Sequence, residues 1–273
     1  MSTRKNPVFM VLLLLLAPPL AMAAASPAPA ALPDGLVATL LKLAGNAPIA
    51  GTLLVDQTSV DGGGAKAKHG QASITLDVSA ARGIDLHVPG SVLEEADQQI
   101  AAHQLDPERS MPTAELLGSV GIVQTQRMLD PAAALRVVLI GAKLLQQVPT
   151  TLDGAPATLL RFDLPLHASK SERDKIKSYH DELSLWLDAQ GVPIAFTRTT
   201  RTDLGWFVLN VDTDRSEQGR FQVVDGRLIT PQIDTQQHTS ALGHHGSTTT
   251  RYTLQVTAPA PRRVANPVAT AGA

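Results

Sequence analysis

Three histidines are the side chains whose type and spacing come closest to a reactive site. His238, His244 and His245 fall together in a polar segment that contains glycine. Imidazole nitrogens bind Zn²⁺ and Cu²⁺, so this cluster is a candidate metal site. Adjacent residues on an extended backbone point to opposite sides, however, and no cysteine or carboxylate completes a coordination shell. We therefore predict a polar loop over 238–247 and no bound metal, and we interpret the other, isolated histidines as ordinary surface residues.

Two other stretches contain residue types that are found in enzymes. Asp212 and Asp214 fall on the same side of an expected strand, next to Arg215, and we interpret them as a solvated polar face. The segment GGGAKAKHG at 62–70 resembles a phosphate loop, but it lacks Gly-Lys-Ser/Thr and precedes a strand instead of a helix. We interpret it as a mobile hairpin loop. Neither Gly-x-Ser-x-Gly nor His-Glu-x-x-His occurs, so the sequence predicts no enzyme, no catalytic residue and no cofactor.

Composition narrows the class of partner. The formal net charge of −2, with lysine and arginine scattered along the chain, argues against a nucleic-acid binder, which shows a basic face. Hydrophobic residues make up 44% of the chain, enough for an aliphatic core. Cysteine is absent. The fold must therefore be held by core burial without disulfides, and no lipid-bearing cysteine anchors the chain.

The first residues predict export. Arg4 and Lys5 precede an apolar run over 9–16, and the small-residue site Ala21-Met22-Ala23 follows. This order is typical of a secretory signal peptide over 1–23, with cleavage near Ala23. The alternative, a transmembrane anchor, needs a span of about 20 residues, and Pro18-Pro19 interrupts this run. We expect a periplasmic or secreted protein with no transmembrane anchor, and a flexible linker over 24–34.

The rest of the chain predicts one domain over 35–258. A short helix over 36–44 precedes strands over 51–60 and 74–88, and a helical block then runs to Gly141. In that block, Ser91 with Glu94 reads as a capping box, a second helix is expected within 114–128, and Asp130 with Pro131 begins a third. Many strands follow, and Asp153-Gly154 and Asp225-Gly226 mark hairpin turns. The tail over 259–273 is expected to be disordered.

Strands joined by tight turns are antiparallel, and a long meander tends to curl. The helical block must bury its apolar stripe, and the apolar face of the curl is the one large surface available. The predicted fold class is therefore α+β, a strongly curved antiparallel β-sheet forming a half-barrel meander, with helices on the concave face.

Three stretches carry a family resemblance. LWLDAQGVPIAFTRT at 185–199, DPAAALRVVLIGA at 130–142 and TTLDGAPATLLRFDLPL at 150–166 resemble, in order and spacing, bacterial envelope proteins of the LolA/LppX type. The resemblance covers roughly residues 130–255. It implies a half-barrel with a helical lid around a hydrophobic cavity, in proteins that carry lipids or lipoproteins across the periplasm or sense envelope stress.

The apolar alternation leaves two interpretations open. The side chains are either core, covered by the protein's own helices, or they line a gap that holds an acyl chain of a lipid or lipoprotein. The candidate cavity-lining residues are Leu185, Leu187, Ile194, Phe196, Phe207, Leu209, Leu135 and Leu139. The expected function is a carrier or sensor of a hydrophobic ligand. The alternative is a non-catalytic module with a packed core that binds another envelope protein through exposed sheet edges.

Overall fold

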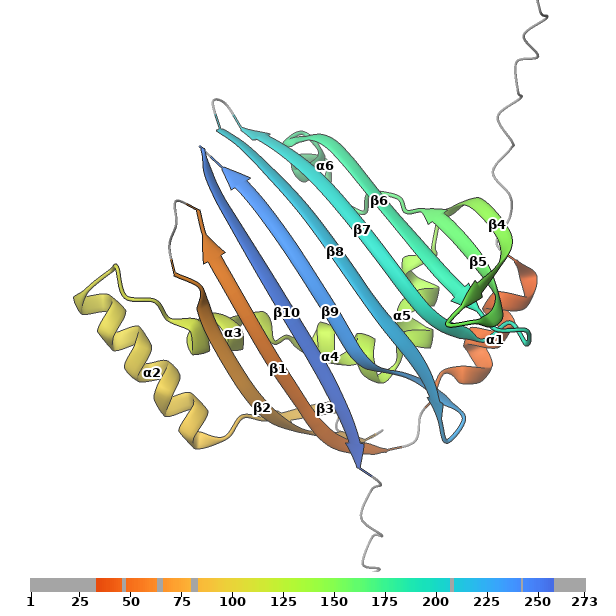
Figure 1. Cartoon of the computed structure of the whole chain (residues 1–273), viewed down its shortest axis with the longest axis horizontal. Helices are drawn as coiled ribbons and strands as arrows, with labels where there is room; N and C mark the ends of the chain where they lie inside the picture. The colour runs from red at the N-terminus through yellow and green to blue at the C-terminus, as the bar shows by residue number, and fades with distance from the viewer. Residues whose placement is uncertain are drawn as a thin grey trace, which may run out of the picture.

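The chain forms one antiparallel sheet with helices packed on one of its faces (Figure 1). The structure is a computed structural model that describes residues 33–45, 48–62, 66–79, 83–206, 209–241 and 243–257. The predicted signal peptide, most of the predicted linker and the predicted tail lie outside these residues. No helix in the described part of the chain has both the length and the apolar character needed to span a bilayer.

The described residues contain six helices and ten strands. The helices are α1 (Asp34–Leu43), α2 (Gly90–Leu105), α3 (Pro112–Ser119), α4 (Ile122–Leu129), α5 (Pro131–Val138) and α6 (Lys170–Arg173). The strands are β1 (Ile49–Asp61), β2 (Lys68–Ser79), β3 (Gly83–His87), β4 (Lys143–Leu152), β5 (Ala155–Asp163), β6 (Ile176–Leu187), β7 (Pro193–Trp206), β8 (Leu209–Val224), β9 (Arg227–Ala241) and β10 (His244–Thr257). The predicted α+β class is confirmed.

The sheet order explains why the helices lie where they do. The strands follow the order β3-β2-β1-β10-β9-β8-β7-β6-β5-β4, so β3 and β4 are consecutive in sequence but form opposite edges. Ten strands spaced about 4.8 Å apart make a sheet roughly 43 Å wide, which the chain between β3 and β4 must cross. Helices α2 to α5 make this crossing, and Figure 1 shows α3, α4 and α5 running behind the strands.

Local sequence accounts for the turns and for one helix start. Asp153 and Gly154 have φ values of 51° and 80°, and Asp225 and Gly226 have 50° and 75°, as a two-residue hairpin requires. The Asp130 side chain accepts a hydrogen bond of 3.0 Å from the Ala133 amide at the start of α5. These three predicted signals are confirmed.

Two helix predictions are wrong. Helix α2 begins at Gly90 after Pro89, and no side chain caps it, so Ser91 and Glu94 form no capping box. Proline at this position already fixes the backbone angle that precedes the first turn. The helix expected within 114–128 is two helices, α3 and α4, separated by an extended break at Val120 and Gly121. Glycine is a poor helix former, so the break falls where helix propensity is lowest.

The predicted loop over 238–247 is also wrong. Strand β9 continues to Ala241 and β10 begins at His244, so all three histidines of the candidate cluster lie on strands. His238 pairs with Ser247, and His245 pairs with Ser240. The segment is polar on both faces, so it lacks the alternation of apolar residues by which a strand is recognised.

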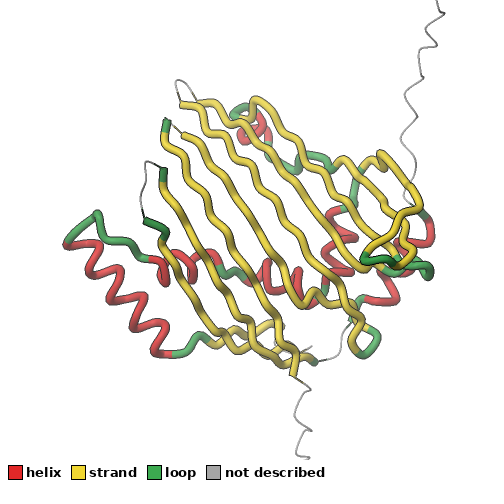
Figure 2. Tube along the Cα trace, in the orientation of Figure 1, coloured by secondary structure: helices red, strands yellow, loops and turns green. Residues whose placement is uncertain are grey.

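The sheet is not strongly curled, and the predicted half-barrel curvature is therefore wrong in degree. Figure 2 shows the long strands side by side in one twisted layer. The two edge strands, β3 and β4, stay at opposite ends of that layer. Apolar side chains occupy only part of each long strand, so there is no continuous apolar inner face around which the sheet would close.

On the helix-facing side, residues paired across the strands form rows of contrasting polarity. One row is buried and apolar except for one glycine: Leu160, Leu185, Phe196, Gly219, Ile233, Tyr252, Val55 and Ala72. The next row mixes both kinds: Phe162, Leu183, Arg198, Glu217, Thr235, Thr250, Gln57 and Gly70. The row after that is polar: Asp181, Thr200, Arg215, Gln237, Thr248, Ser59 and Lys68.

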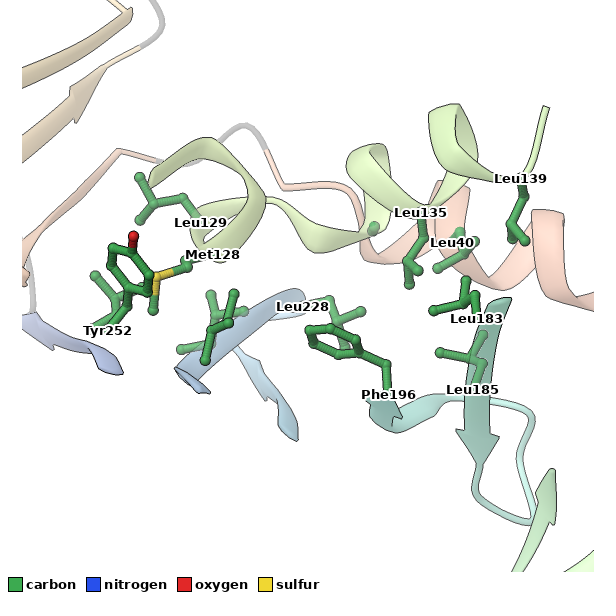
Figure 3. Close-up of a cluster of buried hydrophobic side chains, with 14 of the residues drawn as sticks. Leu40, Met128, Leu129, Leu135, Leu139, Leu183, Leu185, Phe196, Leu228 and Tyr252 are labelled. Carbon is green, nitrogen blue, oxygen red and sulfur yellow. The ribbon is translucent and has the colours of Figure 1, made fainter. Parts of the chain in front are cut away.

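These rows divide the sheet into two halves. We call the part with the apolar row, against which α3, α4 and α5 pack, the covered half, and the part from the polar row onward the bare half. Figure 3 shows side chains of α4, α5 and α1 meeting those of the covered half, with Met128 beside Tyr252 and Leu135 beside Leu40. In the bare half, the short α6 is the one helix among the described residues that lies behind the strands (Figure 1).

Candidate ligand-binding site

A small cavity lies between α4, α5 and the covered half of the sheet. Its volume is about 40 Å³, and apolar side chains make up most of its wall. Two arginines, Arg127 of α4 and Arg198 of β7, stand among them. The lining residues are Arg127, Pro131, Ala134, Leu135, Val138, Leu183, Phe196, Arg198, Phe221, Thr230 and Ile233. Ala134, Leu135 and Val138 of α5 are spaced by three and four residues, so they share the helix face toward the sheet.

The structure brings several of the predicted lining residues together. Leu135 and Phe196 line the cavity, and the Phe196 ring lies 5.3 Å from that of Phe221, between ring centres. Leu139, Leu185 and Leu187 are buried in the same core without lining the cavity.

The other predicted residues lie elsewhere. Ile194 is half-buried at an irregularity where the pairing of β7 with β6 shifts, so it has no opposite partner. Leu209 begins β8, and the structure describes its backbone. Phe207 lies outside the described residues.

A buried carboxylate ties α4 to the sheet beside the cavity. Glu217 of β8 is 4% exposed and accepts hydrogen bonds from Arg127 Nη2 at 2.7 Å and from Arg215 Nη2 at 2.5 Å. Burial alone would raise the pKa of Glu217, but the two guanidinium groups lower it to about 2. The carboxylate therefore stays ionised, and the ion pair with Arg127 holds α4 against β8.

A second buried carboxylate satisfies the other arginine. Asp181 of β6 is 1% exposed and accepts from Arg198 Nη2 at 2.6 Å and from the Tyr179 hydroxyl at 2.7 Å. Burial acts to raise the pKa of Asp181, and the hydrogen bonds from Arg198 and Tyr179 outweigh it, so the net shift is downward. Burial and the bond to Asp181 together raise the pKa of Tyr179 to about 12. These bonds fix Arg198 at the cavity wall.

Sequence reasoning missed this ion-pair cluster. Asp181, Arg198 and Glu217 are separated along the chain, and each looks like an ordinary exposed strand residue. The pairing of Arg198 with Glu217 across β7 and β8 brings them together, and that register cannot be read from one strand alone. The sequence does contain one signal. Arg198 continues the apolar alternation after Phe196, but its side chain is charged.

Four of the residues first considered for chemistry, Asp212, Asp214, His238 and His245, line one surface pocket on β8, β9 and β10, where Asp214 is directly opposite His238. Asp214 forms an ion pair with Arg201 at 3.2 Å, and His69 lies 3.2 Å from Asp56. Within the described ranges, no three histidine or acidic side chains are grouped so that they could hold a metal ion. The candidate site is therefore one that binds through apolar contact and charge.

Comparisons with known proteins gave no match to a protein-family model, to a curated protein or to a solved structure.

Proposed function

We propose that this chain binds a hydrophobic ligand, a lipid or the acyl chain of a lipoprotein, between α4–α5 and the covered half of the sheet. It would act in the bacterial envelope as a carrier or sensor, as the resemblance to proteins of the LolA/LppX type implies. The observation that carries the proposal is the apolar cavity at the interface of α5 with the sheet, lined by Leu135, Leu183, Phe196 and Phe221.

The cavity volume defines what binding requires. Sites for small molecules measure about 300–1,000 Å³, so a cavity of about 40 Å³ is too small to hold an acyl chain, and the proposal requires the cavity to open. A ligand must displace α4 and α5 from the sheet. Both are short helices, and the chain leaves α5 through Gly141, whose φ of 74° suits glycine and gives a natural pivot.

The energetics favour an acyl chain. Displacing α5 would expose Leu135 and Leu139, which the ligand would cover again. Burial contributes about 0.8 kcal/mol per CH₂, so a long chain supplies roughly 10 kcal/mol before the cost of opening. The Arg127–Glu217 ion pair opposes opening and stabilises the closed form.

Native mass spectrometry tests this proposal on protein purified from its own envelope. The expected result is a population with a bound lipid mass. Ala134→Phe places a ring in the cavity, so it should reduce the bound fraction at least fivefold, a change of about 1 kcal/mol. Ala101→Phe, on the exposed side of α2, is the matched control and should keep the wild-type fraction. Protein that carries no lipid, or equal loading of both variants, would contradict the proposal.

A specific observation supports a second candidate function, an interaction module for another envelope protein. The helical layer exposes Ile122 and Val123 of α4, Val137 of α5, and Ile140 just after it, each more than half exposed. Exposed apolar residues of this kind suit a protein partner. The sheet edges suit one less well, because β3 has five residues and β4 contains Pro149. Pull-down from envelope extracts with Val123→Asp as a control tests this function: recovery of lipid without a specific partner would exclude it.

A further inference from the structure

The sheet divides at one end, where β9 separates from β10. Their pairing ends at Thr253 with Gln232. Beyond it, residues 254–257 of β10 pair with β1, and residues 227–229 of β9 pair with β8. Pro231 lacks a backbone donor, and the β8–β9 register shifts between Arg220 and Gln222, so the ladder cannot continue on both sides.

A cleft of about 300 Å³ fills this division. Ile49, Ile229, Leu254 and Val256 supply apolar walls from β1, β9 and β10. The volume lies within the range of small-molecule sites. The cleft shares no lining residue with the cavity beneath α5. It is therefore a separate candidate site, and its existence does not depend on the proposed opening of the helices.

Arg227 is the one cation among the described residues that line the cleft. Its side chain is deeply buried, since the residue is 6% exposed, and its Nε atom has no hydrogen-bond partner. Its Nη2 group donates to the Gly45 carbonyl oxygen. In the described part of the chain, no carboxylate forms an ion pair with it. Burial lowers the pKa of Arg227, and the charge of Asp130 offsets this only in part.

A buried guanidinium without a carboxylate is costly unless a further partner completes it. Asp225 also lines the cleft but makes no ion pair with Arg227. Asp130, the acidic residue whose charge acts on Arg227, is engaged with the Ala133 amide as the cap of α5. The Nε donor of Arg227 is therefore left without a partner, and Arg227 is the charged residue that a group entering the cleft would meet.

We propose that this cleft binds a carboxylate-bearing amphiphile, with the carboxylate on Arg227 and the hydrocarbon chain against Ile229, Leu254 and Val256. The guanidinium fork matches a carboxylate in shape and charge. The apolar walls match a chain of moderate length, because the cleft is at the small end of the ligand-site range.

The register of the β8–β9 hairpin identifies a substitution that tests the role of Arg227 directly. Val224 is directly opposite Arg227 in the β8–β9 hairpin and also lines the cleft. Directly opposed residues have Cβ atoms about 5 Å apart. Val224→Glu therefore places a carboxylate beside the guanidinium inside the protein, which occupies Arg227 without removing it. Val224→Gln has nearly the same shape and no charge, and it is the matched control.

Calorimetric titration of purified, delipidated protein with decanoate and with 1-decanol tests the proposal. The wild type should bind decanoate at least tenfold more tightly than 1-decanol. Val224→Glu should lose this preference, and Val224→Gln should keep it. Arg227→Met should bind the two probes equally.

Three results would overturn the proposal. The first is equal affinity of the wild type for both probes, or no binding of either. The second is wild-type preference for decanoate in Val224→Glu. The third is an Arg227→Met protein that is less stable to heat but keeps its preference for decanoate, because Arg227 would then serve only to hold Gly45. If Arg227→Met does not fold, the two Val224 variants decide alone.

Discussion

The covered and bare halves belong to the same strands and differ in what their side chains meet. In the covered half, Leu185, Phe196 and Ile233 lie in one buried row against the helices. Two rows away in the bare half, Asp181, Thr200 and Gln237 occupy the equivalent positions on the same strands. The ladder of backbone hydrogen bonds continues through both. Strand pairing here therefore does not require an apolar face, but helix packing does.

The charged cluster lies at the border between the halves. Glu217 is opposite Arg198 in the mixed row, where the apolar surface ends. The Arg127–Glu217 ion pair holds α4 at this limit. The covered half thus has an electrostatic boundary beside the cavity. Beyond it, the polar row separates the covered half from a smaller apolar group, Ile176, Leu204 and Val211, beside α6.

The largest effect should come from the covered half. Leu185 of the apolar row is fully buried, so Leu185→Ala should lower the free energy of unfolding by about 2–5 kcal/mol. Thr202→Ala, on the same face in the bare half, should change it by less than about 0.5 kcal/mol. Urea denaturation followed by circular dichroism measures both. Similar losses for the two variants would contradict the division.

Low pH should weaken the Arg127–Glu217 ion pair at the border between the covered and bare halves. The pKa of Glu217 falls from 4.5 to about 2 on folding, which corresponds to roughly 3 kcal/mol. Because the folded protein holds the ionised form, this stability is present above pH 4.5 and is lost as the pH falls from there to about 2. Unfolding free energies measured across this window should drop in the wild type. Glu217→Gln should show a smaller drop, and an unchanged pH dependence in that variant would exclude Glu217 as the cause.

Helix caps provide a matched pair of smaller effects. Asp130→Ala removes the cap of α5, which packs on the covered half, and should cost about 1 kcal/mol. Ser169→Ala removes the cap of α6, a four-residue helix with no buried residue, and should cost less. Thermal unfolding compares the two. A larger loss for Ser169→Ala would show that the helix beside the bare half stabilises the fold more.

The smallest effect should come from an ion pair of the bare half. Arg201 and Asp214 are 68% and 48% exposed and lie 3.2 Å apart. Solvent and salt screen such pairs, so Arg201→Gln should change the free energy of unfolding by less than about 1 kcal/mol. Chemical denaturation at low salt measures it. A loss of several kcal/mol would mean that the bare half contributes more to the stability of the fold than its exposure suggests.

Sequence reasoning succeeded where one short segment determines the structure. The turns at Asp153-Gly154 and Asp225-Gly226 follow from residues that tolerate positive φ, and α5 follows from Asp130 and Pro131. Pairing within hairpins could be predicted from such signals, because tight turns oblige neighbouring strands to pair. The pairing of β1 with β10, which joins the two ends of the domain, has no such signal.

Sequence reasoning failed where structure depends on distant partners. The strand ends around His238 and His245 have no apolar alternation, so the sheet alone reveals them. The curvature was overestimated because it depends on how far the apolar surface extends across all ten strands. The Arg127–Glu217 pair and the isolated Arg227 depend on register and helix placement, which no single segment encodes.

Hydrogen–deuterium exchange with and without bound lipid tests the central claim most directly. If α4 and α5 part from the covered half to admit a ligand, their amides should exchange faster than those of β6–β9 in the lipid-free protein. Bound lipid should change exchange in α4, α5 and the covered half and leave the bare half unaffected. Exchange of α4 and α5 at the same rate as the strands, with no response to lipid, would contradict the account.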